Sequence, residues 1–332
     1  MPIIHYPQTR LRPQDRPANG PPAEQVATIY NRAGRDYIAY ADGDPARLFS
    51  FDGLHGYADR QIWLMLESKL AALRASGAES IRLLDAGCGP GTWLHRLVVR
   101  ALDLGFTSVT ARGFDIAQVQ IRQARMLAKD LCGVPGVDLR FDVADLTERL
   151  AEQDGSVDMT LCLYSVLSHL PVANLADVLR EFARVTSGHL VTAVRSVGST
   201  PSAFVCPVEK VRYLQLDNER DECEIELLDG LRSTFPLHLF TASELRGRFV
   251  PHFDIEDLRG LDLFHTRFAS DPRWNPCRSR IDARLSGVLA RLEETYANEP
   301  ELIDHATHIV LVARSRAAPR FRTVSRAKMP KP

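Results

Sequence analysis

The sequence has no apolar run near the ~20 residues that a membrane-spanning helix needs. Its first residues also lack the apolar core of a secretory signal peptide, so neither membrane insertion nor export is expected. Among the six cysteines no Cys-x-x-Cys pair occurs, which disfavours a zinc site and favours a reduced, cytoplasmic protein. A formal net charge of -1 provides no overall attraction to nucleic acid or to an anionic membrane.

The overall composition is that of a folded globular protein. Hydrophobic residues make up 45% and charged residues 25% of the chain, so no wholesale disorder is expected. With 332 residues the chain can hold one sizeable domain with additions. Residues 1–22, rich in Pro, Arg and Gln, are predicted to form a flexible arm. Residues 315–332, rich in Arg, Lys and Pro, are predicted to form a basic, solvated tail.

A glycine-rich turn follows the first apolar strand pattern. Residues 82–93 read Arg-Leu-Leu-Asp-Ala-Gly-Cys-Gly-Pro-Gly-Thr-Trp, so a strand ending at Asp85 leads into three glycines and the start of a helix. Glycine tolerates positive φ and lets a ligand contact the backbone across the strand end. A dinucleotide fingerprint would read Gly-x-Gly-x-x-Gly, whereas Gly87, Gly89 and Gly91 alternate. The turn therefore predicts a nucleotide-type cofactor that is not a dinucleotide.

Further apolar segments also end in polar residues. Each such residue follows a predicted strand, and amphipathic helices are expected between the strands, the first of them over residues 118–131. This alternation over residues 80–195 predicts a parallel sheet covered by helices on both faces. An acid at the end of the second strand can accept hydrogen bonds from both ribose hydroxyls. The segments and their polar residues are Val109–Ile116 with Asp115, Val137–Phe141 with Asp142 and Asp145, and Val157–Tyr164 with Ser165 and His169.

The Asp-x-Gly-x-Gly-x-Gly sequence from Asp85 to Gly91 closely resembles motif I of the class I S-adenosylmethionine-dependent methyltransferases. The resemblance covers residues 80–195 strongly and implies an α/β fold with a doubly wound, mostly parallel seven-stranded sheet, whose last strand is antiparallel. It implies S-adenosyl-L-methionine as cofactor and S-adenosyl-L-homocysteine as product, with Asp145 facing the adenine amino group. The residues expected to contact the cofactor are Tyr30, Asp85, Gly87, Cys88, Gly89, Gly91, Thr92, Trp93, Asp115, Ile116, Asp145, Leu146, Tyr164 and Ser165.

The remaining elements complete the expected domain over residues 80–314. After a fifth strand at 188–194, residues 196–240 form an insertion that we expect to be β, with residues 223–235 pairing across an Asp229–Gly230 turn. Residues 23–79 are expected to form an N-terminal helical lid, because the family builds its substrate lid from these two regions. The later elements are a capping box at Thr241–Glu244 opening a helix through about Arg248, a strand at 253–263, a helix at 281–296 and a strand at 308–313.

Two residues are candidates for catalysis. Methyl transfer from a sulfonium is an in-line displacement, so the protein must align the acceptor, exclude water and, where needed, accept a proton. His169 lies just beyond the fourth strand, where a histidine in related enzymes sits beside the methyl group; a role as base and a role as a structural neighbour both stay open. Tyr57, in Leu54-His55-Gly56-Tyr57, resembles a tyrosine that closes the lid in small-molecule methyltransferases. Tyr30, Tyr37 and Tyr40 share one side of a predicted helix.

The absence of certain motifs limits the class of methyl acceptor. After the fourth strand the chain has neither the Asp/Asn-Pro-Pro-Tyr motif nor the Pro-Cys nucleophile that methyltransferases of nucleic acids and proteins carry there. Residues 164–174 carry no paired acids for a magnesium ion. We therefore expect metal-independent transfer to O, N or C of a small-molecule acceptor, without nucleic acid as partner and with a homodimer left open. A nicotinamide-dependent oxidoreductase and a catalytically idle cofactor-binding subunit remain as alternatives.

Overall fold

The structure is a computed structural model. It describes residues 22–33, 47–51, 56–199, 205–206, 211–217, 219–227, 230, 232–269, 273–275 and 282–316. The expected arm except Pro22, nearly all of the basic tail, and Tyr37, Tyr40 and His55 lie outside these residues. Within the described part no helix is both long and apolar enough to cross a membrane.

A seven-stranded sheet forms the centre of the molecule, in the order β10-β11-β5-β4-β1-β2-β3. All strands run parallel except β11, which is antiparallel to both of its neighbours. The doubly wound sheet predicted from the sequence is therefore confirmed. The strands are β1 (Ser80–Ala86), β2 (Ser108–Asp115), β3 (Val137–Val143), β4 (Val157–Cys162), β5 (Thr186–Arg195), β10 (Phe253–Leu261) and β11 (His308–Ser315).

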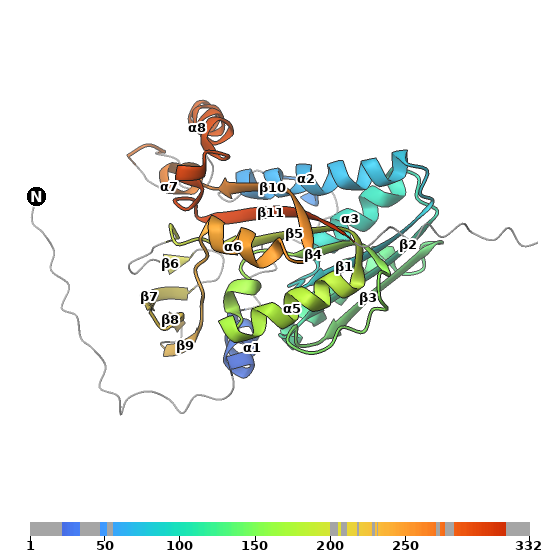
Figure 1. Cartoon of the computed structure of the whole chain (residues 1–332), viewed down its shortest axis with the longest axis horizontal. Helices are drawn as coiled ribbons and strands as arrows, with labels where there is room; N and C mark the ends of the chain where they lie inside the picture. Colours follow the sequence, from blue (N-terminus) through green and yellow to red (C-terminus); the bar gives the residue numbers. More distant parts are fainter. Residues whose placement is uncertain are drawn as a thin grey trace, which may run out of the picture.

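Helices cover both faces of the sheet, as Figure 1 shows. The period-2 alternation of the strands explains this arrangement, because successive side chains enter opposite hydrophobic clusters. In β11, Val310 and Val312 face the cluster that α2 and α3 complete, whereas Ile309 and Leu311 face the cluster that α5 and α6 complete. The flanking helices are α2 (Gly56–Ala75), α3 (Thr92–Asp103), α4 (Gln118–Leu127), α5 (Val172–Val185), α6 (Ala242–Phe249) and α9 (Pro300–Ile303).

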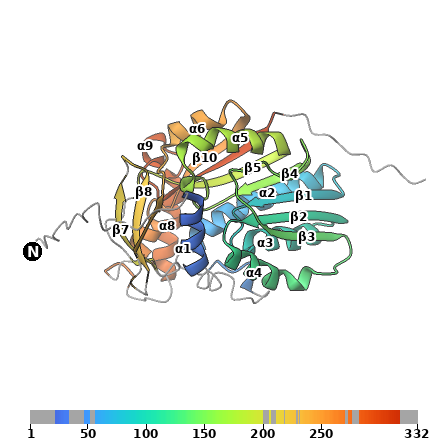
Figure 2. The ribbon, with the colours of Figure 1, turned by 90° about the horizontal axis from the view of Figure 1, so that it is seen from below.

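The insertion after β5 forms a second, antiparallel sheet at one end of the molecule. Its order is β6-β7-β8-β9, with bounds Val205–Cys206, Val211–Asp217, Glu222–Leu227 and Arg232–Pro236. The expected pairing of residues 223–235 is confirmed, with Cys223 opposite Phe235. Helix α1 (Pro22–Ala33) lies between this sheet and α4 (Figure 2), and its Val26 and Ile29 are buried against Ile225 and Phe235.

Several element ends differ from the expected ones for local reasons. The strand expected at 253–263 ends at Leu261, because the chain turns at Asp262, where φ is 62°. The helix expected at 281–296 begins at Ala283, since the carboxylate of Asp282 caps it by accepting from two backbone N–H groups. The helix expected at 118–131 tightens into a 3-10 turn after Leu127. The Thr241 cap is confirmed, and its hydroxyl accepts from the Glu244 N–H at 3.1 Å.

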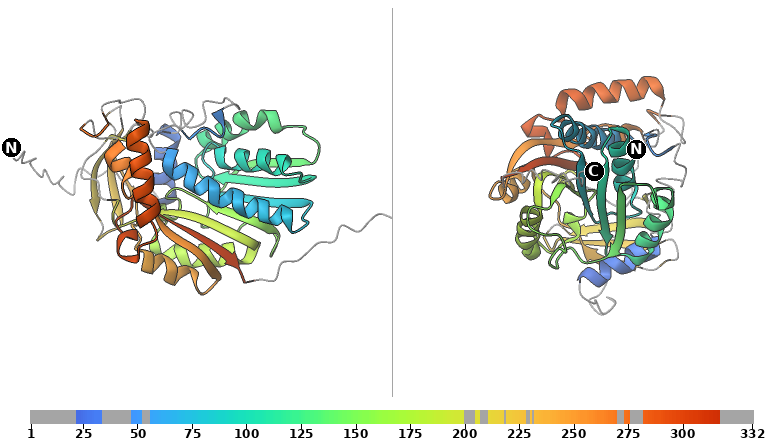
Figure 3. Two further views of the ribbon diagram at one scale, coloured as in Figure 1. Left: turned by 90° about the horizontal axis from the view of Figure 1, so that it is seen from above. Right: turned by 90° about the vertical axis from the view of Figure 1, so that its right-hand side faces the viewer.

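Two helices near the C-terminal part complete the structure. These are α7 (His265–Ala269) and α8 (Ala283–Tyr296). Helix α8 lies at the outside of the molecule, beyond α2 (Figure 3), and within it only Leu289 and Glu293 are buried. The Glu293 carboxylate accepts the N–H groups of Leu263, Phe264 and His265, so α8 holds the start of α7.

Candidate cofactor and acceptor site

A cavity of about 580 Å³ lies at the carboxyl ends of the central strands. The strand order reverses between β1 and β4, and in open α/β sheets ligands bind at such a switch point. The described residues that line the cavity come from the helices α1, α2, α3, α4 and α5, from the turn after β1, from the ends of β2, β3, β4, β5 and β10, and from the start of β11. The sheet topology thus brings together the strand ends whose polar residues the sequence analysis selected one by one.

The glycine turn is fixed to the end of β2. The backbone N–H groups of Gly87 and Cys88 donate to the Phe114 carbonyl at 2.8 and 2.9 Å, and Gly89 N–H donates to the Asp115 carboxylate at 3.0 Å. The other oxygen of Asp115 accepts from Ala117 N–H at 2.8 Å. Burial raises the pKa of Asp115, and these two hydrogen bonds oppose that rise. The carboxylate is therefore held in one orientation beside the turn.

The three glycines have different roles in this turn, although all have positive φ. A Cβ on Gly89 would meet nothing within 4 Å, so this residue borders open space in the cavity wall. A Cβ on Gly87 would approach Val166 to 2.4 Å. A Cβ on Gly91 would lie 2.8 Å from Phe141, and Gly91 does not line the cavity. Gly91 therefore serves close packing of α3 on the sheet, whereas Gly89 borders the ligand space.

Three buried polar atoms on the cavity wall have no hydrogen-bond partner within the described part of the chain. They are one carboxylate oxygen of Asp85, the hydroxyl of Thr92 and the amide oxygen of Gln120. Asp85 is 2% exposed, and its burial, with the nearby charge of Asp115, raises its pKa to about 8. Unpartnered polar atoms are costly in a protein interior, and a polar ligand in the cavity would satisfy them. The site therefore fits a ligand with hydrogen-bond donors.

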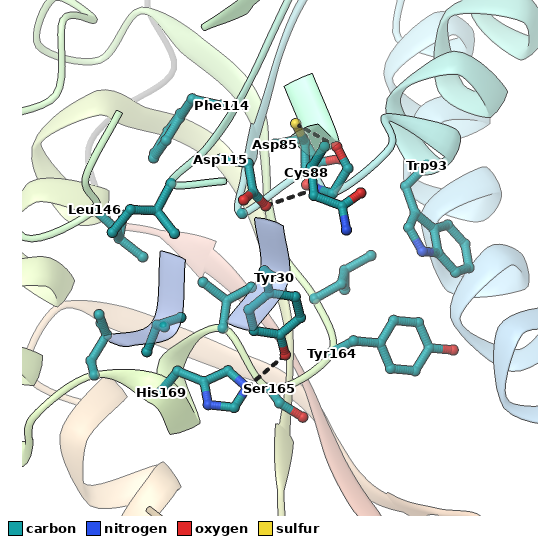
Figure 4. A pocket seen from close by; sticks show the side chains of 18 of the residues that line it. Tyr30, Asp85, Cys88, Trp93, Phe114, Asp115, Leu146, Tyr164, Ser165 and His169 are labelled. Carbon is teal, nitrogen blue, oxygen red and sulfur yellow. Dashed lines mark hydrogen bonds between the residues drawn. The ribbon is translucent and has the colours of Figure 1, made fainter. Parts of the chain in front are cut away.

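Most of the predicted site residues meet at this cavity. Figure 4 places Asp85, Cys88 and Asp115 on one side, His169 and Ser165 across from them, and Tyr30 between the two groups. The predicted residues that line the cavity are Tyr30, Asp85, Gly87, Cys88, Gly89, Thr92, Trp93, Asp115, Ile116, Asp145, Leu146, Tyr164, Ser165 and His169. Of the two acids after β3, Asp145 lines the cavity, whereas Asp142 pairs with Arg112 at 2.9 Å.

Tyr57 lies elsewhere. It does not line the cavity, and its ring stacks on His265 with the centroids 4.8 Å apart. Burial raises the pKa of Tyr57, and burial lowers the pKa of His265 to about 4. The short resemblance around Tyr57 therefore marks the start of α2, a helix that packs on the sheet, and no contact with the cavity supports its predicted lid role.

The chain bends sharply where β4 ends. Tyr164 and Ser165, with φ of 48° and 70°, are consecutive non-glycine residues in the left-handed region. Such backbone costs roughly 1–2 kcal/mol per residue, and it persists where surrounding contacts enforce it. The Tyr164 hydroxyl donates to the buried carboxylate of Asp59 on α2, and its ring contacts Trp93 and His308. The bend thereby brings Tyr164 and Ser165 to the cavity wall.

Sequence reasoning missed several residues of the wall. Arg195 follows the fifth predicted strand directly, so the strand-end rule that identified Asp115 would also have selected it. His308 lines the cavity because β11 runs antiparallel and begins at this edge. Asp59, which does not line the cavity but accepts from the Tyr164 hydroxyl, had no signal in the sequence, since it lies within a helix far from the glycine turn. Within the described residues no group of three potential metal ligands occurs.

Comparison with known proteins gives one family match. Residues 83–188 match the family model of a methyltransferase domain. No curated protein matches the chain at a significant level. The match begins in β1 and ends in β5, so it contains the glycine turn and the ends of β2, β3 and β4.

Many solved structures match the chain. The magnesium protoporphyrin IX methyltransferase of Synechocystis PCC 6803 with bound SAM is 15% identical, with a TM-score of 0.48, and the alignment covers 90% of this chain and 99% of that chain. A SAM-dependent methyltransferase of Methanosarcina mazei is 20% identical, with a TM-score of 0.44, over 71% and 93% of the two chains.

Because these scores are low, the assignment rests on the family model and on the sheet order and glycine turn of this chain. Together they show a methyltransferase domain over residues 83–188.

Proposed function

We propose that the enzyme transfers a methyl group from S-adenosylmethionine to O, N or C of a small-molecule acceptor by in-line displacement, without a metal ion. The observation that carries this proposal is one continuous cavity between the glycine turn with Asp115 and the turn with His169. A cavity of this size is in the range of small-molecule sites. It has room for groups of both the cofactor and an acceptor, and its residues after β4 lack the motifs of nucleic acid and protein methyltransferases.

The cofactor end of the cavity offers matching partners for S-adenosylmethionine. The half-buried carboxylate of Asp115 has accepting capacity left for the ribose hydroxyls after its two backbone contacts. The unpartnered oxygen of Asp85 suits the α-ammonium group, and Asp145 suits the adenine amino group. An ammonium beside Asp85 would favour the ionised carboxylate, which burial alone disfavours.

The chemical contribution of the protein is mainly alignment. The bound cofactor supplies an electrophilic methyl carbon on a sulfonium, and the chain must hold the acceptor in line behind it. Alignment of this kind can remove ~7–11 kcal/mol of a barrier. The strained Tyr164–Ser165 bend and the ring contacts of Trp93 make a rigid wall for that purpose.

The acceptor end is mixed in polarity. His169, Arg195, Asp262 and His308 contribute polar groups, whereas Leu163, Leu170 and Pro171 contribute apolar surface. This supports a partly hydrophobic acceptor that also carries polar groups. We further propose that residues 23–79 and 196–240 recognise it, since α1 lines the cavity and Phe235 of β9 packs against His169. In the part of residues 23–79 that the structure describes, α2 packs on the sheet, so α1 is the segment that supports a lid.

Cofactor and turnover can be tested on the purified full chain. S-adenosylmethionine at about 100 times its Kd should stabilise the protein by about 2.7 kcal/mol, and NAD should not. Cofactor labelled on its methyl group is then incubated with phenols, carboxylic acids and amines, and we expect label in at least one product. Stabilisation by NAD alone would favour the oxidoreductase alternative. Cofactor binding without transfer to any acceptor, including those of a metabolite extract, would favour the idle subunit.

The cofactor contact is tested with a matched pair of acids. Asp115→Ala should weaken S-adenosylmethionine binding by about 1–3 kcal/mol, because two ribose hydroxyls lose their acceptor. Asp142→Ala is the control, since Asp142 follows the neighbouring strand but pairs with Arg112 and does not line the cavity. Isothermal calorimetry measures both variants. Equal affinities in folded Asp115→Ala and wild-type protein would remove Asp115 from the site.

A further inference from the structure

The protonation of His169 follows from its neighbours. Its Nδ1 lies 3.1 Å from the carbonyl oxygen of Pro236, and a carbonyl oxygen can only accept. Nδ1 must therefore carry the proton of this hydrogen bond. In the neutral imidazole this leaves Nε2 as an acceptor. Nε2 lies 2.9 Å from the hydroxyl oxygen of Tyr30, so the Tyr30 hydroxyl donates to it.

Both residues are held in place from several sides. The rings of Tyr30 and Phe235 pack against the His169 ring, with centroids 5.6 and 5.2 Å away. The backbone N–H of His238 donates to the Ser168 carbonyl at 2.7 Å, which joins the turn carrying His169 to the segment that follows β9. Tyr30 is fixed through α1, whose Val26 and Ile29 are buried against the insertion sheet. The Tyr30–His169 pair is thus a built contact between the N-terminal helix and the turn after β4.

The same geometry limits what His169 can do alone. Its Nε2 already accepts from Tyr30, and its Nδ1 already donates to Pro236. Both ring nitrogens of His169 are therefore occupied while Tyr30 is in place, and neither can accept a proton directly from an acceptor molecule in the cavity. The Tyr30 oxygen can accept a hydrogen bond as well as donate one, and Tyr30 lines the cavity.

We propose that Tyr30 and His169 form a two-residue proton relay, in which Tyr30 contacts the acceptor and His169 acts through Tyr30. The proposal rests on the proposed function and assigns the acceptor to the O–H or N–H compounds that lose a proton on methylation. As the acceptor atom forms its bond to the methyl carbon, the carbon–sulfur bond breaks and its electron pair stays on sulfur. The acceptor proton moves to the Tyr30 oxygen, while the Tyr30 proton moves to Nε2 of His169. The resulting imidazolium keeps its Nδ1 hydrogen bond to Pro236 and later releases a proton to solvent.

The relay requires an unprotonated Nε2, which nuclear magnetic resonance can test without an acceptor. The full chain, labelled with ¹⁵N-histidine and saturated with S-adenosylhomocysteine, should show His169 with a protonated Nδ1 and an unprotonated Nε2 above pH 7. The signal is assigned by its loss in His169→Gln. Tyr30→Phe should shift the Nε2 resonance and leave Nδ1 unchanged, whereas Tyr296→Phe, on the outer helix α8, should shift neither. A protonated Nε2 in the wild-type protein would overturn the relay.

Turnover of an identified acceptor tests whether Tyr30 and His169 speed up the reaction as one unit. Tyr30→Phe and His169→Gln should each lower kcat by about 10²-fold, because each interrupts the proton path. The double variant should be no slower than the slower single variant, since residues that act as one unit are not additive. Unchanged or raised turnover in Tyr30→Phe would show that Tyr30 only covers His169, and additive losses would show independent roles. Calorimetry should give near wild-type S-adenosylhomocysteine binding in His169→Gln; a wild-type protein that does not bind would instead defeat the proposed function.

Discussion

At the scale of single residues, two glycines of the turn have different roles, one in ligand binding and one in packing. Gly89 has open space where a Cβ would lie, whereas the same atom on Gly91 would overlap Phe141. Both residues have positive φ, so alanine brings backbone strain of roughly 1–2 kcal/mol at either position. Any difference in stability or cofactor affinity between the two alanine variants therefore comes from the atoms around each glycine and not from backbone strain.

This difference leads to a paired prediction. Gly91→Ala should lower the free energy of unfolding by about 1–3 kcal/mol more than Gly89→Ala, because only Gly91 adds a steric clash to the strain. Gly89→Ala should remain folded and lose at least about tenfold in cofactor affinity, since its methyl group enters the cavity. Urea denaturation and calorimetry measure the two effects. A Gly89→Ala protein with wild-type affinity would mean that the cofactor does not approach this part of the turn.

At the scale of elements, α1 connects parts of the site that are distant in sequence. Its Tyr30 reaches the turn after β4, and its Asn31 side chain accepts from the Val119 N–H at 3.0 Å. Val119 is in the first turn of α4, which has no side-chain cap of its own, because its N-cap residue is Ala117. The first N–H groups of a helix need such partners. One short helix therefore stabilises both the start of α4, next to Asp115, and the His169 turn.

The capping contact can be tested directly. Asn31→Ala should destabilise the protein by about 0.5–2 kcal/mol, the usual cost of losing an N-cap. The amide of Val119 should then exchange its hydrogen faster, while amides in the middle of α5 keep their wild-type rates under native conditions. Hydrogen exchange followed by nuclear magnetic resonance measures both. Unchanged protection of Val119 would show that the cap contributes nothing in solution.

At the scale of the whole molecule, the buried acids couple folding to pH. Burial raises the pKa of Asp85 to about 8, from a usual value of 3.8. Between these values the folded protein binds a proton at Asp85 that the unfolded chain has released, so stability falls as pH rises. Burial raises the pKa of Asp59, Asp115 and Glu293 as well, which acts in the same direction. His265, with a lowered pKa of about 4, acts in the opposite direction only below about pH 6.5.

We therefore predict that the cofactor-free protein loses stability between pH 7 and 8. The contribution of Asp85 is at most about 1.4 kcal/mol per pH unit, and Asp85→Asn should remove it and flatten the slope. Saturating S-adenosylmethionine should also flatten the slope, because its ammonium favours the ionised carboxylate. Urea denaturation at several pH values gives the slopes. A slope that is the same in Asp85→Asn as in the wild-type protein would contradict both the raised pKa and its cause.

The sequence by itself determined the class of fold and half of the site. Apolar periodicity located the strands of the central sheet, and alternating glycines after β1 indicated the cofactor. Asp85, Asp115, Asp145 and His169 could be found because each lies at the end of a strand or shortly after it, and parallel strands end at one edge of a sheet. These are local signals, carried by a residue and its neighbours in the chain.

Tertiary structure alone decided which residues face each other. No local pattern pairs Tyr30 with His169, 139 positions apart, or Tyr164 with Asp59, because these contacts depend on how helices pack on the finished sheet. The same holds for Tyr57, whose sequence surroundings resembled a lid residue but whose ring packs on His265. Local sequence fixes the direction of a strand and the residue at its end. Contacts between side chains from distant segments are selected by the packing of the whole domain.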